Sequence, residues 1–63
     1  MHQVRARAIV DRITNTRWKV EVWGQPPHDY VRVYTIDARS DNMAAREGLD
    51  RFVAEMEALE DVG

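Results

Sequence analysis

Apolar and polar residues alternate in three short segments of the chain, at residues 4–10, 18–22 and 30–38. A period of two is typical of a β-strand that has one face in solvent. The polar residues at 14–16 favour a turn, and the second break, at residues 24–29, contains two prolines, which cannot donate hydrogen bonds to a strand ladder. Because connections this short make neighbouring strands antiparallel, we predict a three-stranded antiparallel meander.

The alternation predicts which side chains face the core in the second segment, residues 18–22, but not in the third. Trp18, Val20 and Val22 share one side of it and are expected to face the core. The third segment has two sides that can be buried, one with Val31, Val33 and Thr35 and the other with Tyr30, Arg32, Tyr34 and Ile36. Alternation alone does not distinguish them, so either set can point inward.

The last third of the chain has the periodicity of a helix. Ser40 or Asp41 is expected to cap it, because a side-chain oxygen there accepts a hydrogen bond from a free backbone N–H. One stripe of this helix collects Ala45, Gly48, Leu49, Phe52, Met56 and Leu59. A helix over residues 41–59 is about 28 Å long, which matches a strand of about eight residues, so it can cover one face of the sheet. The predicted fold is α+β, a single small domain over residues 1–63 with the order β-β-β-α.

Gly48 lies in the middle of this helix, where glycine costs about 1 kcal/mol relative to alanine. One explanation is a close approach of the helix to the sheet, over the ring of Trp18. The other is a contact between the helices of two copies of the chain, with Ala44 one turn away.

Size and composition limit what supports such a fold. A chain of 63 residues buries only about 60% of the surface that its unfolded form exposes, so its stability is marginal. The absence of cysteine excludes disulfides and thiolate zinc sites. His2 and His28 lack the spacing of a metal site, and we expect neither a metal nor another cofactor. Self-association or a protein partner is the remaining source of support.

Charge is unevenly distributed along the chain. Residues 1–39 carry seven basic and four acidic side chains, a net +3, whereas residues 40–63 carry two basic and seven acidic side chains, a net −5. There is no run of about 18 apolar residues and no apolar segment typical of a signal peptide. We therefore expect no membrane span and a cytoplasmic location.

Basic and aromatic side chains are expected to gather on the outer face of the sheet. The predicted partner-binding residues are Arg5, Arg7, Lys19, Trp23, Tyr30, Arg32 and Tyr34. Such a surface can bind a protein, because tryptophan, tyrosine and arginine dominate the binding energy of protein interfaces. It can also stack bases and neutralise phosphates, so a nucleic-acid-binding module is the alternative. Large apolar groups on this face, among them Ile9 and Ile36, favour a homodimer with Trp23 near its centre.

Catalysis is not expected from this sequence. His28 and Asp29 are adjacent, and their side chains point apart, so one cannot orient the other as in a catalytic triad. No nucleophilic serine or cysteine and no glycine-rich phosphate loop lies nearby. We predict a non-enzymatic protein with no small-molecule substrate, in which the two prolines stiffen the loop that presents His28 and Tyr30.

Two segments resemble known families. The segment YTIDARSDNMAAREGL, residues 34–49, is similar to the same part of HicB-type antitoxins, and this implies a partial RNase H-like β-β-β-α core that binds a toxin. Residues 18–34, with the motif PPHDY, together with AAREGLDRFVAEME, resemble small proteins of unknown function from actinobacterial bacteriophages. The second resemblance implies a phage accessory protein that works inside a host cell.

Overall fold

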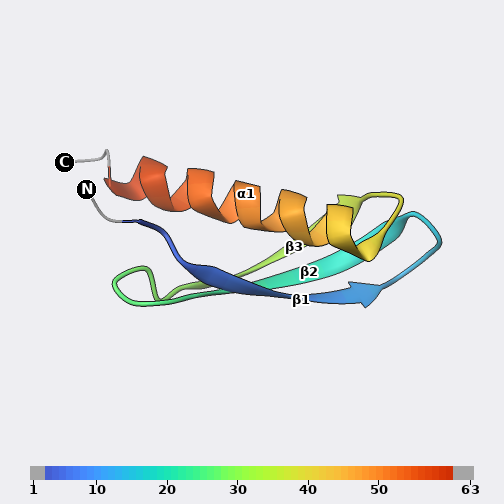
Figure 1. Cartoon of the computed structure of the whole chain (residues 1–63), viewed down its shortest axis with the longest axis horizontal. Helices are drawn as coiled ribbons and strands as arrows, with labels where there is room; N and C mark the ends of the chain where they lie inside the picture. Colours follow the sequence, from blue (N-terminus) through green and yellow to red (C-terminus); the bar gives the residue numbers. More distant parts are fainter. Residues whose placement is uncertain (1–2, 61–63) are drawn as a thin grey trace.

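The computed structural model describes residues 3–60, which form one sheet and one helix in the predicted order. The strands are β1 (Ala6–Arg12), β2 (Arg17–Gly24) and β3 (Val31–Asp37), and the helix is α1 (Asp41–Glu60). The strand order is β1-β2-β3, and both neighbouring pairs are antiparallel. In Figure 1, α1 runs along one face of the sheet, and no element of residues 3–60 covers the opposite face. The α+β meander with one C-terminal helix is therefore confirmed.

The core lies between α1 and the inner face of the sheet. Val20 and Val22 of β2 are completely buried, as the period of two predicts. Trp18 is partly buried against the same core, and its indole N–H donates to the carbonyl oxygen of Ala38 at 2.9 Å. This bond ties β2 to the segment that precedes α1, so the helix starts at a fixed position over the sheet.

The pairing of β3 with β2 determines which side of β3 faces the helix. Trp18 lies opposite Ile36 and Val20 lies opposite Tyr34. Directly opposed residues of an antiparallel pair point to the same face, so Tyr34 and Ile36 belong to the inner face. Ile36 is almost fully buried. The side left in solvent carries Val31, Val33 and Thr35.

The start of α1 is capped as expected. The Ser40 hydroxyl oxygen accepts a hydrogen bond from the N–H of Met43 at 3.3 Å, and the Ser40 carbonyl oxygen accepts one from the N–H of Ala44 at 3.0 Å. Ser40 is therefore the N-cap, and Asp41 is the first helical residue.

The buried stripe of α1 differs from the predicted one at its two ends. Gly48, Phe52 and Met56 are buried as predicted, but Ala44 is buried in place of Ala45. Leu59 is 50% exposed, so its predicted contact with the sheet is wrong. The buried residues are spaced by four, along a ridge that is inclined to the helix axis, and this ridge does not pass through Leu59.

Gly48 allows α1 to approach β2 closely. A Cβ atom at Gly48 would lie 2.5 Å from Val20 Cγ1, closer than two carbon atoms can pack. The close-approach explanation is therefore correct, although the side chain beneath Gly48 is Val20 and not Trp18. Ala44 and Gly48 are both buried against the chain's own sheet, so the alternative of a helix–helix contact through them is wrong.

The connection between β2 and β3 folds back onto the end of the sheet. Within this connection, the His28 N–H donates to the Gln25 carbonyl oxygen at 2.8 Å. At its ends, the Gly24 N–H donates to the Tyr30 carbonyl oxygen at 2.8 Å. A Cβ at Gly24 would meet the His28 carbonyl oxygen and the Phe52 ring, so glycine is required there. No helix within residues 3–60 combines the length and apolar character needed to cross a bilayer.

Candidate binding site on the outer sheet face

The outer face of the sheet, which points away from α1, is built from cross-strand rows of side chains. From the loop end of the sheet these rows are Arg7–Trp23–Val31, Ile9–Glu21–Val33, Asp11–Lys19–Thr35 and Arg17–Asp37. Arg5 extends this face by one position, because its carbonyl oxygen accepts a hydrogen bond from the N–H of Gln25 at 2.9 Å. The predicted residues Arg5, Arg7, Lys19 and Trp23 therefore share one surface.

Four large apolar side chains occupy the first two rows of this face. The exposed fractions are 53% for Ile9, 45% for Trp23, 44% for Val31 and 57% for Val33. These residues, named here the outer apolar patch, are neighbours in the register and surround Glu21. Contiguous exposed apolar groups of this kind mark interaction sites, whereas single ones are ordinary.

Two pairs of opposite charges lie side by side on the outer face. Arg17 forms an ion pair with Asp37, with Nε and Oδ1 3.2 Å apart, and Lys19 lies directly across from Asp11. Among the charged side chains of this face, Arg5, Arg7 and Glu21 have no opposite charge across the strand pair in the register. The face is therefore mixed in charge and not a basic stripe.

Three of the predicted partner-binding residues do not lie on this face. Arg32 and Tyr34 share the side of β3 that faces α1, because the pairing with β2 buries Ile36 on that side. Tyr30, the residue before β3, lines a pocket with Met56 and Leu59. Arg32 Nε donates to Glu55 Oε2 at 2.5 Å, and the hydroxyl of Tyr34 donates to the other Glu55 oxygen at 3.4 Å. The Arg32 guanidinium also lies 5.3 Å from the centre of the Tyr30 ring. The outer face therefore lacks the two tyrosines and one arginine that were assigned to it.

Glu55 and the surrounding protein change the acidity of Tyr34. Burial raises the pKa of the Tyr34 phenol above its ordinary value of 10.0, and the nearby Glu55 carboxylate raises it further. Arg32 acts in the opposite direction, with a smaller effect. Tyr34 is therefore held in its neutral form, as a donor to Glu55.

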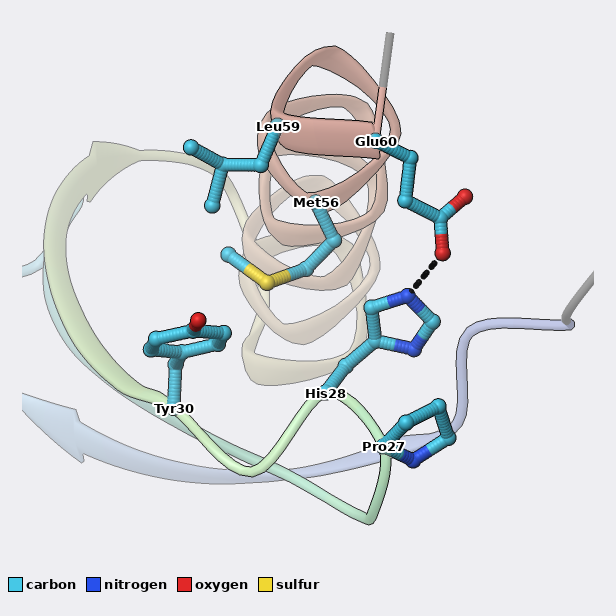
Figure 2. Close-up of a pocket in the computed structure, with 6 residues that line it drawn as sticks. All are labelled: Pro27, His28, Tyr30, Met56, Leu59 and Glu60. Atoms are coloured by element: carbon cyan, nitrogen blue, oxygen red, sulfur yellow. Dashed lines mark hydrogen bonds and ion pairs between the residues drawn. The ribbon is translucent and has the colours of Figure 1, made fainter. Parts of the chain in front are cut away.

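A second feature lies at the end of the molecule where the β2–β3 loop meets the last turn of α1. His28 is 5% exposed, and its Nε2 contacts Glu60 Oε1 (Figure 2). The expectation that the loop presents His28 to solvent is therefore wrong. A cavity of about 240 Å³, named here the end pocket, is lined by Pro27, His28, Tyr30, Met56, Leu59 and Glu60.

Sequence reasoning missed Glu55 as a partner of β3 and Glu60 as a partner of the β2–β3 loop. Glu60 continues the row of every fourth residue that contains Phe52 and Met56, and this signal places it above the sheet end. Glu55 lies one position before Met56, at the border of the same row. In the sequence, both positions contribute only to the net charge of −5 over residues 40–63.

The described part of the chain offers surfaces for contact at these two sites. Residues 3–60 contain no group of three or more histidine or acidic side chains arranged to hold a metal ion. The outer face offers apolar groups and mixed charges, and the end pocket offers one histidine–carboxylate contact beside apolar side chains.

Comparison with protein-family models, with curated proteins and with solved structures finds no match to this chain. The resemblances to phage proteins and to HicB-type antitoxins therefore stay predictions.

Proposed function

We propose that this chain is a non-enzymatic protein-binding domain, and that its outer sheet face associates with the same face of a second copy. The observation that carries the proposal is the outer apolar patch on a face that no element of residues 3–60 covers. A small domain that leaves four large apolar side chains side by side in water gains stability when a partner covers them.

The distribution of charge supports a second copy as the partner. In a two-fold contact each surface meets itself. A two-fold axis that crosses the strands between Trp23 and Glu21 would bring the outer apolar patches of the two copies together. With that axis, Arg5 of each copy meets Asp11 of the other, and Arg7 lies diagonally across from Glu21. Arg5 would thus meet an opposite charge at the rim, where such contacts contribute specificity more than affinity. Arg7 would lie near the Glu21 carboxylate inside the contact.

Charge-swap variants test this arrangement. Arg5→Glu and Asp11→Lys each create a like-charge contact in the proposed dimer and should each weaken it. The double variant restores opposite charges between the copies and should recover most of the lost affinity. Because six residues along one strand span about 20 Å, Arg5 and Asp11 of one chain cannot compensate for each other.

The readout is the dimer dissociation constant from sedimentation equilibrium, with unfolding curves as a check that each variant is folded. Arg17→Glu is the matched control, because it changes a charge on the outer face two rows away from the outer apolar patch. Additive weakening in the double variant would refute the two-fold arrangement, and a monomeric wild type would refute the dimer.

Binding of single-stranded nucleic acid by the same face is the second candidate. Arg5 and Arg7 beside Trp23 favour it, since a base can stack on the indole while arginines contact phosphates. Its support is reduced because Arg32 is paired with Glu55 and Lys19 lies across from Asp11. Phosphate neutralisation supplies most of such affinity, so anisotropy of labelled oligonucleotides at about 50 mM salt is the test. No binding under those conditions removes this candidate.

The proposal extends to the setting in which the contact forms. Resemblance to small phage-encoded proteins suggests an accessory protein in an infected cell, and the absence of cysteine fits the reducing cytoplasm. Resemblance to HicB-type antitoxins would imply a toxin as the partner instead. A monomeric wild type in the same experiments would favour that partner over a second copy.

A further inference from the structure

The end pocket is separate from the outer sheet face and has two chemically different sides. Figure 2 shows Tyr30 and Leu59 on one side of Met56, and His28 with Glu60 on the other. Tyr30 is 46% exposed and Leu59 is 50% exposed, so two large apolar side chains border an opening. The pocket therefore combines an apolar wall with a carboxylate.

The size of the end pocket limits what it can hold. Its volume of about 240 Å³ lies below the roughly 300–1,000 Å³ of sites for drug-sized molecules. An apolar cavity of about 150 Å³ is enough for benzene. The end pocket therefore suits one aromatic ring or one branched aliphatic side chain.

The contacts of His28 leave one oxygen of the Glu60 carboxylate free. Nε2 contacts Glu60 Oε1, whereas Nδ1 is buried and has no hydrogen-bond partner within residues 3–60. No hydrogen bond or ion pair within residues 3–60 reaches Glu60 Oε2, and the Glu60 side chain is 39% exposed. The second carboxylate oxygen is therefore available to a cation from solvent.

The surroundings of Glu60 add to this negative charge. The last turn of α1 contains no basic residue, and Glu57 lies in the same turn. The C-terminal end of a helix carries a partial negative charge of its own. Arg32, the cation next to Tyr30, is paired with Glu55. A ligand that brings a positive charge to this end of the molecule therefore meets a carboxylate oxygen that no cation within residues 3–60 contacts.

We infer that the end pocket binds a segment of a partner polypeptide in which an aromatic or leucine-sized side chain is flanked by lysine or arginine. The apolar side chain enters between Tyr30, Met56 and Leu59. The neighbouring cation reaches the Glu60 carboxylate, at the oxygen that His28 does not contact. This contact is independent of the proposed dimer, because none of these residues belongs to the outer sheet face.

Peptides with matched sequences test the inference by titration into the full chain, followed by amide NMR spectra. Acetyl-Lys-Phe-Lys-amide should cause saturable shifts at the amides of His28, Tyr30 and Leu59. Acetyl-Glu-Phe-Glu-amide should bind about fivefold more weakly, the upper end for one exposed ion pair. Acetyl-Lys-Gly-Lys-amide, which lacks the anchor, should cause no saturable shifts.

Two variants separate the carboxylate from general charge. Glu60→Gln retains an oxygen that accepts from His28, and it should reduce the preference for the basic peptide over the acidic one to about twofold or less. Asp50→Asn is the control: it removes the same charge at an exposed position of α1, ten residues before Glu60 and outside the pocket, and it should retain the preference. The inference is wrong if the acidic peptide binds equally well, if the anchor is dispensable, if the shifts map to the outer sheet face, or if both variants behave alike.

Discussion

The side chains of Arg32 and Glu55 join β3 to α1, with Arg32 Nε and Glu55 Oε2 2.5 Å apart. They are 38% and 39% exposed, so water screens the pair only in part. We expect a double-mutant cycle with Arg32→Met and Glu55→Gln to give a coupling free energy of about 0.5–1 kcal/mol, decreasing with salt. The ion pair Arg17–Asp37 is the control, because its side chains are 56% and 73% exposed and its coupling should be smaller. Equal coupling in both cycles would show that partial burial does not strengthen the Arg32–Glu55 ion pair.

Tyr34 should make the domain more sensitive to alkali. Burial first, and the Glu55 carboxylate second, raise the pKa of Tyr34 above 10.0 in the folded state. The folded state then holds the phenol proton more tightly than the unfolded state. The stability that Tyr34 contributes in this way is fully present below the unfolded-state pKa of 10.0. It is lost as the pH rises through the folded-state pKa.

The measurement is the free energy of unfolding by urea as a function of pH. Above pH 10 it should fall more steeply in the wild type than in Tyr34→Phe, which has no phenol to ionise. Glu55→Gln should give an intermediate dependence because it removes the second cause of the shift. Parallel curves for all three proteins would show that Tyr34 does not titrate differently on folding.

Gly48→Ala should destabilise the domain although alanine is the better helix former. The gain in helix propensity is about 1 kcal/mol, but the new Cβ would lie 2.5 Å from Val20 Cγ1. Overpacking against a stiff, buried valine costs about 1–3 kcal/mol, so we expect a net loss of up to about 2 kcal/mol. Ala54→Gly, at an exposed position of α1, should cost about 1 kcal/mol from propensity alone. An increase in stability for Gly48→Ala would contradict the close approach of α1 to β2.

Phe52→Ala should unfold most of the population. Phe52 is completely buried between α1 and the sheet, and removal of such a ring costs about 3–5 kcal/mol. That loss is comparable to the whole stability of a small domain. Leu59→Ala, at a half-exposed position of the same helix, should retain a cooperative thermal transition. A cooperative transition within a few degrees of wild type for Phe52→Ala would contradict the helix-on-sheet core.

Much of this fold follows from local patterns in the sequence. Val20 and Val22 were predicted as core residues because β2 has one clearly apolar side. Phe52 and Met56 followed from the helical period. The orientation of β3 did not follow, because both of its sides carry residues that can be buried, and only its pairing with Trp18 and the valines of β2 selects one.

The candidate site was predicted only in part for the same reason. Arg5, Arg7, Lys19 and Trp23 lie on β1 and β2, or next to them, where the alternation was unambiguous. Arg32 and Tyr34 were assigned to the wrong face because their partner, Glu55, is more than twenty residues away in the chain. Local periodicity contains no information on such a contact. The burial of His28 by Glu60 depends on tertiary structure in the same way.

Sedimentation equilibrium of the wild type and of Trp23→Ala tests the central proposal most directly. Both proteins are measured at tens of micromolar, a concentration on the order of the dissociation constant of a weak dimer. Trp23 lies in the first row of the outer apolar patch and is exposed in the single chain, so its loss should weaken the dimer without unfolding the monomer. We expect a dimer for the wild type and a shift toward monomer of at least about tenfold in dissociation constant for the variant, within the range for an interface tryptophan. A monomeric wild type, or a dimer that is indifferent to Trp23→Ala, would contradict association through the outer sheet face.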